Sequence, residues 1–229
     1  MTWLDANRDY VLDMLVQHVR LAVPAIAISV LVAILLGRIA WRWPRIGTVV
    51  LGIASLLYSV PALPLLIVIP VVLGIPLRSG LTLVVALAVY GTALLAGTAA
   101  DAFRSVDPRV REAAEAMGYS RTGLFWKVDL PLAVPVLLSG IRVITVSTVS
   151  LVTIGALVGI PSLGNLLTDG FQRDIRAEIL VGVLGTMLLA ITLDVLLVVT
   201  GALLTPWRGG RARTRTTTAS TAPAAEGVA

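Results

Sequence analysis

The sequence predicts an all-α integral membrane protein with about five transmembrane helices and a cytoplasmic helix-turn-helix. Of its 229 residues, 57% are hydrophobic and 14% are charged, whereas soluble domains are about 45–50% apolar and about 25% charged. Five segments each hold about 20 mostly apolar residues, the length that crosses a hydrocarbon core about 30 Å thick. A polar, basic stretch at about residues 104–130 separates the third of these segments from the fourth.

The five apolar segments lie, in order, at about residues 15–37, 46–73, 81–103, 132–158 and 179–204. The second differs from the others because Pro61 and Pro64 interrupt it. Membrane helices tolerate proline where neighbouring groups satisfy the freed carbonyls, so two alternatives stay open for this segment. It is one bent span, or a span followed by a short re-entrant piece.

The distribution of arginine and lysine predicts the orientation, because cytoplasmic connections carry an excess of both residues. One side of the membrane has twelve: Arg38, Arg42, Arg45, Arg104, Arg109, Arg111, Arg121, Lys127, Arg208, Arg211, Arg213 and Arg215. The other side has four: Arg8, Arg78, Arg173 and Arg176. We therefore expect a multi-pass protein of a bacterial cytoplasmic membrane, with its N-terminus outside and its C-terminus inside. This topology explains the net charge of +5, so no nucleic-acid partner is expected.

Two terminal segments flank the predicted membrane domain, which covers residues 14–206. Residues 1–13 lack the basic region and the small-residue cleavage site of a signal peptide, so we expect a retained extracytoplasmic segment. Residues 207–229 are rich in Thr, Ala and Arg and poor in bulky apolar residues. That composition is typical of a disordered tail, which the orientation places in the cytoplasm.

The polar stretch at residues 104–130 has the signals of two short helices. Asp107 is a good N-cap and Pro108 suits the first helical position. Gly118 suits the position just past a helix end, where a positive φ is needed. Ser120 is a good cap for a second helix, which we expect Pro131 to stop. The first helix has one apolar face, made by Val110, Ala113, Ala114 and Met117.

Six landmarks in this stretch have the spacing of the EAA signature, and the chain resembles the permease subunits of ABC importers that carry it. They are Glu112, Ala113, Ala114, Gly118, Val128 and Pro131. The family usually has isoleucine where Val128 stands. From about residue 12 to residue 206, the chain is similar to the permeases of osmoprotectant importers, as in SVPALPLLIVIPVVLGIP and VITVSTVSLVTIGALVGIPSLGNLL. The resemblance implies a five-span fold of the methionine-importer type and a substrate such as glycine betaine, choline, carnitine or proline betaine.

By this resemblance, residues 104–130 are the coupling loop of the transporter. Its first short helix is expected to dock into a groove on a cytoplasmic ATPase subunit, with Glu112 capping or bridging to that subunit. Ala113 and Ala114 would permit close approach, and Gly118 would make the elbow. The resemblance also implies a second permease subunit, identical or different, and an extracytoplasmic substrate-binding protein.

The sequence excludes ATP hydrolysis by this chain. It has no G-x-x-x-x-G-K-[ST] loop, and its only lysine, Lys127, does not lie in a glycine-rich segment. We therefore expect ATP and Mg²⁺ on the partner ATPase and no cofactor on this chain. With no cysteine and a single histidine, His18, the chain is expected to have neither a metal site nor a catalytic centre.

Ionisable side chains inside membrane segments are candidate functional residues. Asp194 lies in the fifth segment, where it either pairs with a positive group or faces the transport pathway. Arg142, early in the fourth segment, is expected to extend toward the cytoplasm. Tyr58 and Tyr90 have aromatic faces that attract quaternary ammonium cations, although Tyr58 also fits an interfacial belt. The predicted pathway residues are Tyr58, Ser59, Pro61, Tyr90 and Asp194.

Residues 159–165 open the last outer loop, where we expect an outer gate or a contact with the binding protein. Two alternatives to osmoprotectant import stay open. The first is an ABC importer for another small zwitterion or an amino acid. The second is an ion-coupled secondary transporter, which would need charge relays within the membrane and internal repeats. The chain has few of the former and no clear case of the latter.

Overall fold

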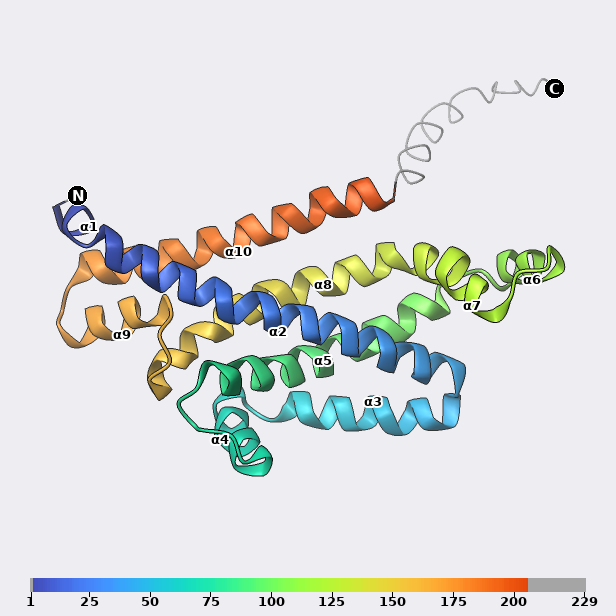
Figure 1. Cartoon of the computed structure of the whole chain (residues 1–229), viewed down its shortest axis with the longest axis horizontal. Helices are drawn as coiled ribbons and strands as arrows, with labels where there is room; N and C mark the ends of the chain where they lie inside the picture. Colours follow the sequence, from blue (N-terminus) through green and yellow to red (C-terminus); the bar gives the residue numbers. More distant parts are fainter. Residues whose placement is uncertain (1, 206–229) are drawn as a thin grey trace, which may run out of the picture.

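The computed structural model describes residues 2–205, and helices make up almost all of that range. Four helices are long and apolar enough to cross a membrane, and a bent pair of shorter helices supplies a fifth candidate span. This arrangement, with four or five candidate spans, confirms the predicted all-α class of about five transmembrane helices. The four long helices run along the length of the molecule (Figure 1); they are α2 (Arg8–Arg42), α5 (Gly80–Arg104), α8 (Leu130–Val152) and α10 (Arg176–Leu204).

Helices α2, α5 and α8 form the packed centre of the bundle, and small residues let them approach closely. A Cβ atom built on Gly37 of α2 would lie 2.6 Å from the Cβ atom of Ala99 of α5. Such glycines and alanines are what membrane helices use where dispersion contacts, rather than hydrophobic exclusion, hold them together. α5 is the most buried of the long helices, and its fully buried residues include Leu95, Ala96 and Phe103.

The second predicted span is broken into α3 (Pro44–Ser59) and α4 (Ala62–Leu73), which meet at an angle of 114°. The break falls at Pro61 because proline has no N–H to continue the ladder of α3. Pro64 does not break the chain, since it lies in the first turn of α4, where amide hydrogens have no helical partner. At 1.5 Å per residue, α3 is about 24 Å long and α4 about 18 Å. Neither piece alone crosses a core about 30 Å thick.

The helix that contains the fourth span begins earlier than the predicted start of that span. α7 (Arg121–Leu124) continues through one π-helical segment, η1 (Phe125–Asp129), into α8 and then into the 3₁₀ segment η2 (Thr153–Val158). The prediction that Pro131 stops the second short helix is therefore wrong. The N–H of Leu130 bonds to the carbonyl of Phe125, so the turn is already wide where the proline enters. A wide turn accommodates a ring that would otherwise clash with the preceding turn.

Two short helices complete the end of the bundle opposite α6 and α7 (Figure 1). They are α1 (Thr2–Ala6) and α9 (Gly164–Gln172), and α9 packs against α10 and η2. The sequence predicted only a loop after Gly159. Gly159, at φ +82°, ends η2, and Gly164 begins α9 where a Cβ would lie 2.1 Å from the carbonyl oxygen of Thr153. The predicted tail at 207–229 lies outside the described residues.

Candidate functional site

The predicted helix-turn-helix lies at one end of the bundle and has the local geometry that its sequence predicts. α6 (Pro108–Ala116) begins with Asp107, whose carboxylate accepts a hydrogen bond of 2.9 Å from the N–H of Arg109. Gly118 follows the helix with φ +84°, and the N–H of Tyr119 bonds back to the carbonyl of Ala114 at 3.2 Å. These bonds form a Schellman-type end, which needs a residue that adopts positive φ. The elbow at Gly118 is confirmed.

The second arm of the helix-turn-helix is α7, capped as predicted by Ser120. The Ser120 hydroxyl accepts a hydrogen bond of 3.1 Å from the N–H of Gly123. Leu124 of this arm is buried, whereas Val128 and Pro131 are half-buried in the helix that continues from it. The elbow therefore joins α6 to a helix that runs without interruption through the bundle.

The surface of α6 and its elbow exposes large apolar side chains on an otherwise polar element. Val110 and Met117 are 46% and 70% exposed, and Trp126 of η1, beyond the second arm, is 62% exposed. Glu112 and Ala113 are also exposed, whereas Ala114 is buried within the chain itself. The predicted apolar face is thus divided, with Ala114 packed inward and the remainder facing out. Apolar side chains exposed among charged ones mark an interaction surface. We call this surface, which contains Val110, Glu112, Ala113 and Met117, the α6 tip.

The base of the α6 tip is fixed by Arg111, a residue that the sequence did not single out beyond its charge. Its guanidinium carbon lies 4.6 Å from the ring centroid of Trp41, at the end of α2. Its Nη2 lies 3.9 Å from Oδ2 of Asp129, a carboxylate that is almost fully buried. Its Nε lies 3.5 Å from Glu115 Oε1. One side chain therefore ties α6 to both α2 and η1.

An aromatic cluster extends this base inward. The guanidinium carbon of Arg38 lies 3.5 Å from the ring centroid of Phe125 in η1. The Phe125 ring also packs against the ring of Phe103 in α5, with centroids 6.0 Å apart. Phe103 in turn lies 6.0 Å from Trp41. The only sequence signal for the packed base of the α6 tip was a pair of opposite charges, Arg111 and Asp129, on the two arms of one helix-turn-helix. Their distance of 18 positions gave no reason to pair them before the elbow was known.

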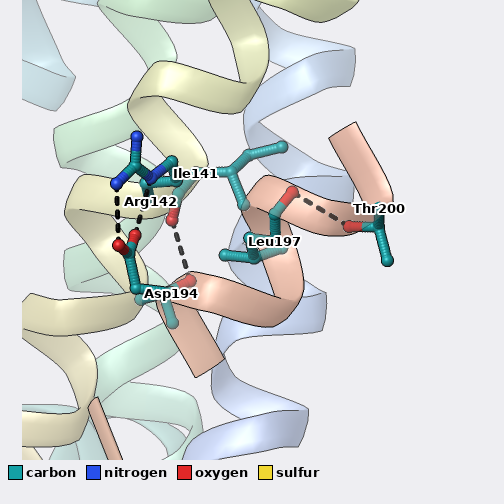
Figure 2. Close-up of polar contacts among 6 residues, drawn as sticks. Ile141, Arg142, Asp194, Leu197 and Thr200 are labelled. Carbon is teal, nitrogen blue, oxygen red and sulfur yellow. Dashed lines mark hydrogen bonds and ion pairs between the residues drawn. The ribbon is translucent and has the colours of Figure 1, made fainter. Parts of the chain in front are cut away.

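Within the spans, Arg142 of α8 and Asp194 of α10 form a two-bond ion pair (Figure 2). The Nε and Nη2 donors of Arg142 each lie 2.7 Å from one carboxylate oxygen of Asp194. The charge of Arg142 therefore has a partner on another span, and the expectation that its side chain extends toward the cytoplasm stays a prediction. Asp194 has the positive partner that one of its two predicted roles required.

Asp194 also lines a groove of about 490 Å³ between α8, α9 and α10. The polar side chains of Ser150, Thr153 and Thr186 lie on the same lining. The second predicted role for Asp194, facing an open pathway, is thus compatible with its pairing.

The other predicted pathway residues lie elsewhere in the bundle. The rings of Tyr58 and Tyr90 are in contact, with centroids 5.4 Å apart. Tyr58 and Ser59 line a pocket of about 330 Å³ between α3 and α5, next to the break at Pro61. α3 packs on α2 and α5, whereas α10 packs on α8 and α9, at opposite edges of the view in Figure 1. The structure therefore separates Asp194 from the tyrosine pair.

Comparison with known proteins gives a consistent set of relatives. The sequence profile of the binding-protein-dependent transport system inner membrane component matches residues 14–209. The chain is 33% identical to the osmoprotectant import permease protein OsmW of Salmonella typhimurium over 206 residues, 87% of this chain and 94% of that protein. It is 28% identical to the carnitine transport permease protein OpuCD of Listeria monocytogenes over 196 residues, 85% of this chain and 86% of that protein.

Two solved structures share the fold. The MetNI methionine ABC transporter in an inward-facing conformation superimposes with a TM-score of 0.72 at 18% identity, covering 86% of this chain and 96% of that one. An amino acid ABC transporter crystallised with histidines superimposes with a TM-score of 0.68 at 16% identity, covering 90% and 97%. The fold predicted from the sequence, of the methionine-importer type, is confirmed.

Proposed function

The chain belongs to the family of binding-protein-dependent transport system inner membrane components, and we propose that it imports an osmoprotectant such as glycine betaine, choline, carnitine or proline betaine. It is a multi-pass permease subunit, a transporter rather than an enzyme. The observation that carries the substrate class is the 33% identity to an osmoprotectant import permease across 87% of this chain. Substrate recognition by a separate binding protein is part of the proposal.

The α6 tip is the proposed docking surface for a cytoplasmic ATPase subunit that binds ATP and Mg²⁺. Exposed Val110 and Met117 supply apolar contact area, and Glu112 and Ala113 of the same helix are also exposed. Closure of two ATPase subunits would push on this tip, and the continuous helix beyond Gly118 would pass that motion into the bundle. Coupling of this kind needs an element with two positions that both ends can bias.

The proposed orientation places the α6 tip in the cytoplasm and the α1–α9 end outside. Arg104, Arg109 and Arg121 all lie at the α6 end, and cytoplasmic connections are the ones enriched in arginine. The α1–α9 end would then meet the extracytoplasmic binding protein. A second permease subunit, identical or different, would complete the membrane domain.

The pocket between α3 and α5 is the proposed place for passing contacts with a quaternary ammonium group. The Tyr58 ring is 46% exposed and in contact with Tyr90, and aromatic faces attract such cations. Ser59 ends α3 and Pro61 directly precedes α4, so both residues lie at the break between the two helices. Weak contact is appropriate here, because a solute that binds tightly within a pathway does not leave it.

Uptake by the assembled transporter tests the proposal. The chain, its ATPase, its partner permease and its binding protein are reconstituted in liposomes, and uptake of labelled glycine betaine, choline, carnitine and proline betaine is measured with internal ATP. We expect saturable uptake of at least one of the four that stops without ATP. Uptake of none contradicts the substrate class. Uptake that persists without the ATPase contradicts the importer mechanism and favours secondary transport.

A further inference from the structure

The Arg142–Asp194 pair lies well inside the membrane spans rather than at their ends. Asp194 follows the start of α10 by 18 residues and precedes its end by 10, which places it about 27 Å and about 15 Å from the two ends. Arg142 follows the start of α8 by 12 residues, or about 18 Å. Both charges are therefore at depths where lipid-facing side chains are apolar.

Neither side chain is fully covered by the chain itself. The Arg142 side chain is 47% exposed and that of Asp194 is 24% exposed. Ionised groups at membrane depth face a bundle interior or a water-filled cavity, because hydrocarbon solvates them poorly. This side of α8 and α10 consequently faces water or protein rather than lipid.

The groove beside Asp194 and the other large groove of the bundle differ in the residues that line them. The groove that Asp194 lines continues along the hydroxyl-bearing residues Ser150, Thr153 and Thr186. The groove between α2, α3 and α5 is lined by aliphatic side chains, with Thr92 as its polar member. Four of the ten residues that line the first groove are polar and the other six are apolar, whereas one of the twelve that line the second is polar. The first groove is therefore the better candidate for a water-filled pathway.

The pair has unused bonding capacity on its open side. A guanidinium has five N–H donors, and Arg142 directs two of its nitrogens at Asp194 (Figure 2). Within residues 2–205 its Nη1 has no hydrogen-bond partner. A carboxylate that reaches Nη1 can therefore bond to it while the pair stays closed.

We infer that Arg142 and Asp194 form a contact that selects zwitterions in the transport pathway. A solute with a carboxylate and a quaternary ammonium group fits the pair in antiparallel orientation, with its carboxylate on Arg142 and its ammonium beside Asp194. The quaternary nitrogen has no N–H, so it needs negative potential rather than a hydrogen-bond acceptor, and the Asp194 carboxylate provides it. This inference rests on the proposed function, because it assumes that the chain transports such solutes.

Two single substitutions test the inference through opposite changes in selectivity. In the reconstituted transporter, KM is measured for uptake of glycine betaine, a zwitterion, and of choline, a cation without a carboxylate. Arg142→Gln removes the carboxylate contact, so we expect the KM for glycine betaine to rise about tenfold and that for choline to stay unchanged or fall. Asp194→Asn leaves an unpaired positive charge, so we expect the KM for choline to rise more than that for glycine betaine.

A purely structural pair gives a different pattern. It predicts that both variants impair both solutes equally, and that result overturns the inference. Wild-type KM for glycine betaine in Arg142→Gln also overturns the inference, and this test holds where the wild type carries no choline.

The control is Arg45→Gln, which removes an exposed arginine at the start of α3, outside both the α6 tip and the α1–α9 end. Its KM values should equal those of the wild type. Membrane abundance of each variant is measured by immunoblot, so that loss of insertion is not read as loss of transport. Failure of the wild type to carry any osmoprotectant contradicts the proposed function, whereas normal wild-type uptake with unaltered selectivity in both variants contradicts only the zwitterion contact.

Discussion

Replacing Arg111 with alanine should uncouple transport from ATP hydrolysis without preventing membrane insertion. Arg111 joins α6 to two other elements, Trp41 at the end of α2 and Asp129 in η1. The substitution leaves Asp129 buried without its ion-pair partner. The α6 tip would then still present its apolar surface, but its position relative to the bundle would be poorly defined.

The magnitude follows from the two contacts. At 3.9 Å, two unit charges near a protein surface attract by about 4 kcal/mol, and a cation over an aromatic ring contributes about 0.5–2 kcal/mol. Desolvation of Arg111 and Asp129 offsets part of this gain. We therefore expect the docked position of α6 to lose about 2–4 kcal/mol, a change of roughly 30-fold to a thousandfold in its population.

The assay compares solute uptake with ATP hydrolysis in proteoliposomes that contain the complete transporter. We expect Arg111→Ala to retain ATPase activity and to lose at least about tenfold in solute imported per ATP hydrolysed. Arg109→Ala is the matched control, because Arg109 lies on the same helix but its side chain has no ion pair among residues 2–205. If Arg111→Ala imports as much solute per ATP as Arg109→Ala, the assignment of Arg111 as the link is wrong.

Three further predictions concern the elbow, the packing and the pathway. Gly118→Trp places a bulky residue at φ +84°, which costs about 1–2 kcal/mol in backbone strain, and should give an inserted permease whose uptake no longer follows ATP hydrolysis. Gly37→Ala should lower the melting temperature of the purified complex, because its Cβ would lie 2.6 Å from that of Ala99 and overpacking costs about 1–3 kcal/mol. Tyr58→Leu should raise the KM for a quaternary ammonium solute about two- to fivefold through loss of the aromatic face.

Each of these three predictions has a control substitution, either at the same residue or at a comparable glycine. Asn tolerates positive φ, so Gly118→Asn separates backbone strain from bulk; intact coupling in Gly118→Trp would refute the elbow assignment. Gly52→Ala adds a Cβ with nothing within 4 Å, and an equal melting temperature for both glycine variants would contradict tight α2–α5 packing. Tyr58→Phe keeps the ring, so identical KM values for the Leu and Phe variants would exclude an aromatic contact.

The spans were predictable because each depends on local composition alone. A run of about 20 apolar residues needs no knowledge of its neighbours to be identified as a span, and α5 and α10 begin within a few residues of their predicted starts. The end of the second short helix was not predictable from Pro131. The free-energy cost of a proline in a helix depends on the hydrogen bonds of the preceding turn, and the turn before Pro131 is π-helical. α9 was missed because its nine residues are too few to give a clear period.

The candidate sites also divide into residues that the sequence could place and residues that it could not. Asp107, Gly118 and Ser120 act on neighbouring backbone groups, so sequence was enough to place them. The partner of Arg142 lies 52 residues away, and nothing in either segment indicates the register at which α8 meets α10. The pairing of such a charge depends on a tertiary contact, and so the partner of Arg142 was not predictable from the sequence.

The two proposed sites are connected by one helix. Arg111, at the base of the α6 tip, contacts Asp129 of η1, and η1 continues into α8 without a break as far as Arg142. The distance from Phe125 to Arg142 is 17 residues, about 26 Å of helix. We therefore expect a shift of the tip to displace Arg142 relative to Asp194, which belongs to a different helix. If Arg142 and Asp194 hold a zwitterion, ATP-driven motion at the tip changes the affinity of that contact, and by linkage bound solute biases the tip.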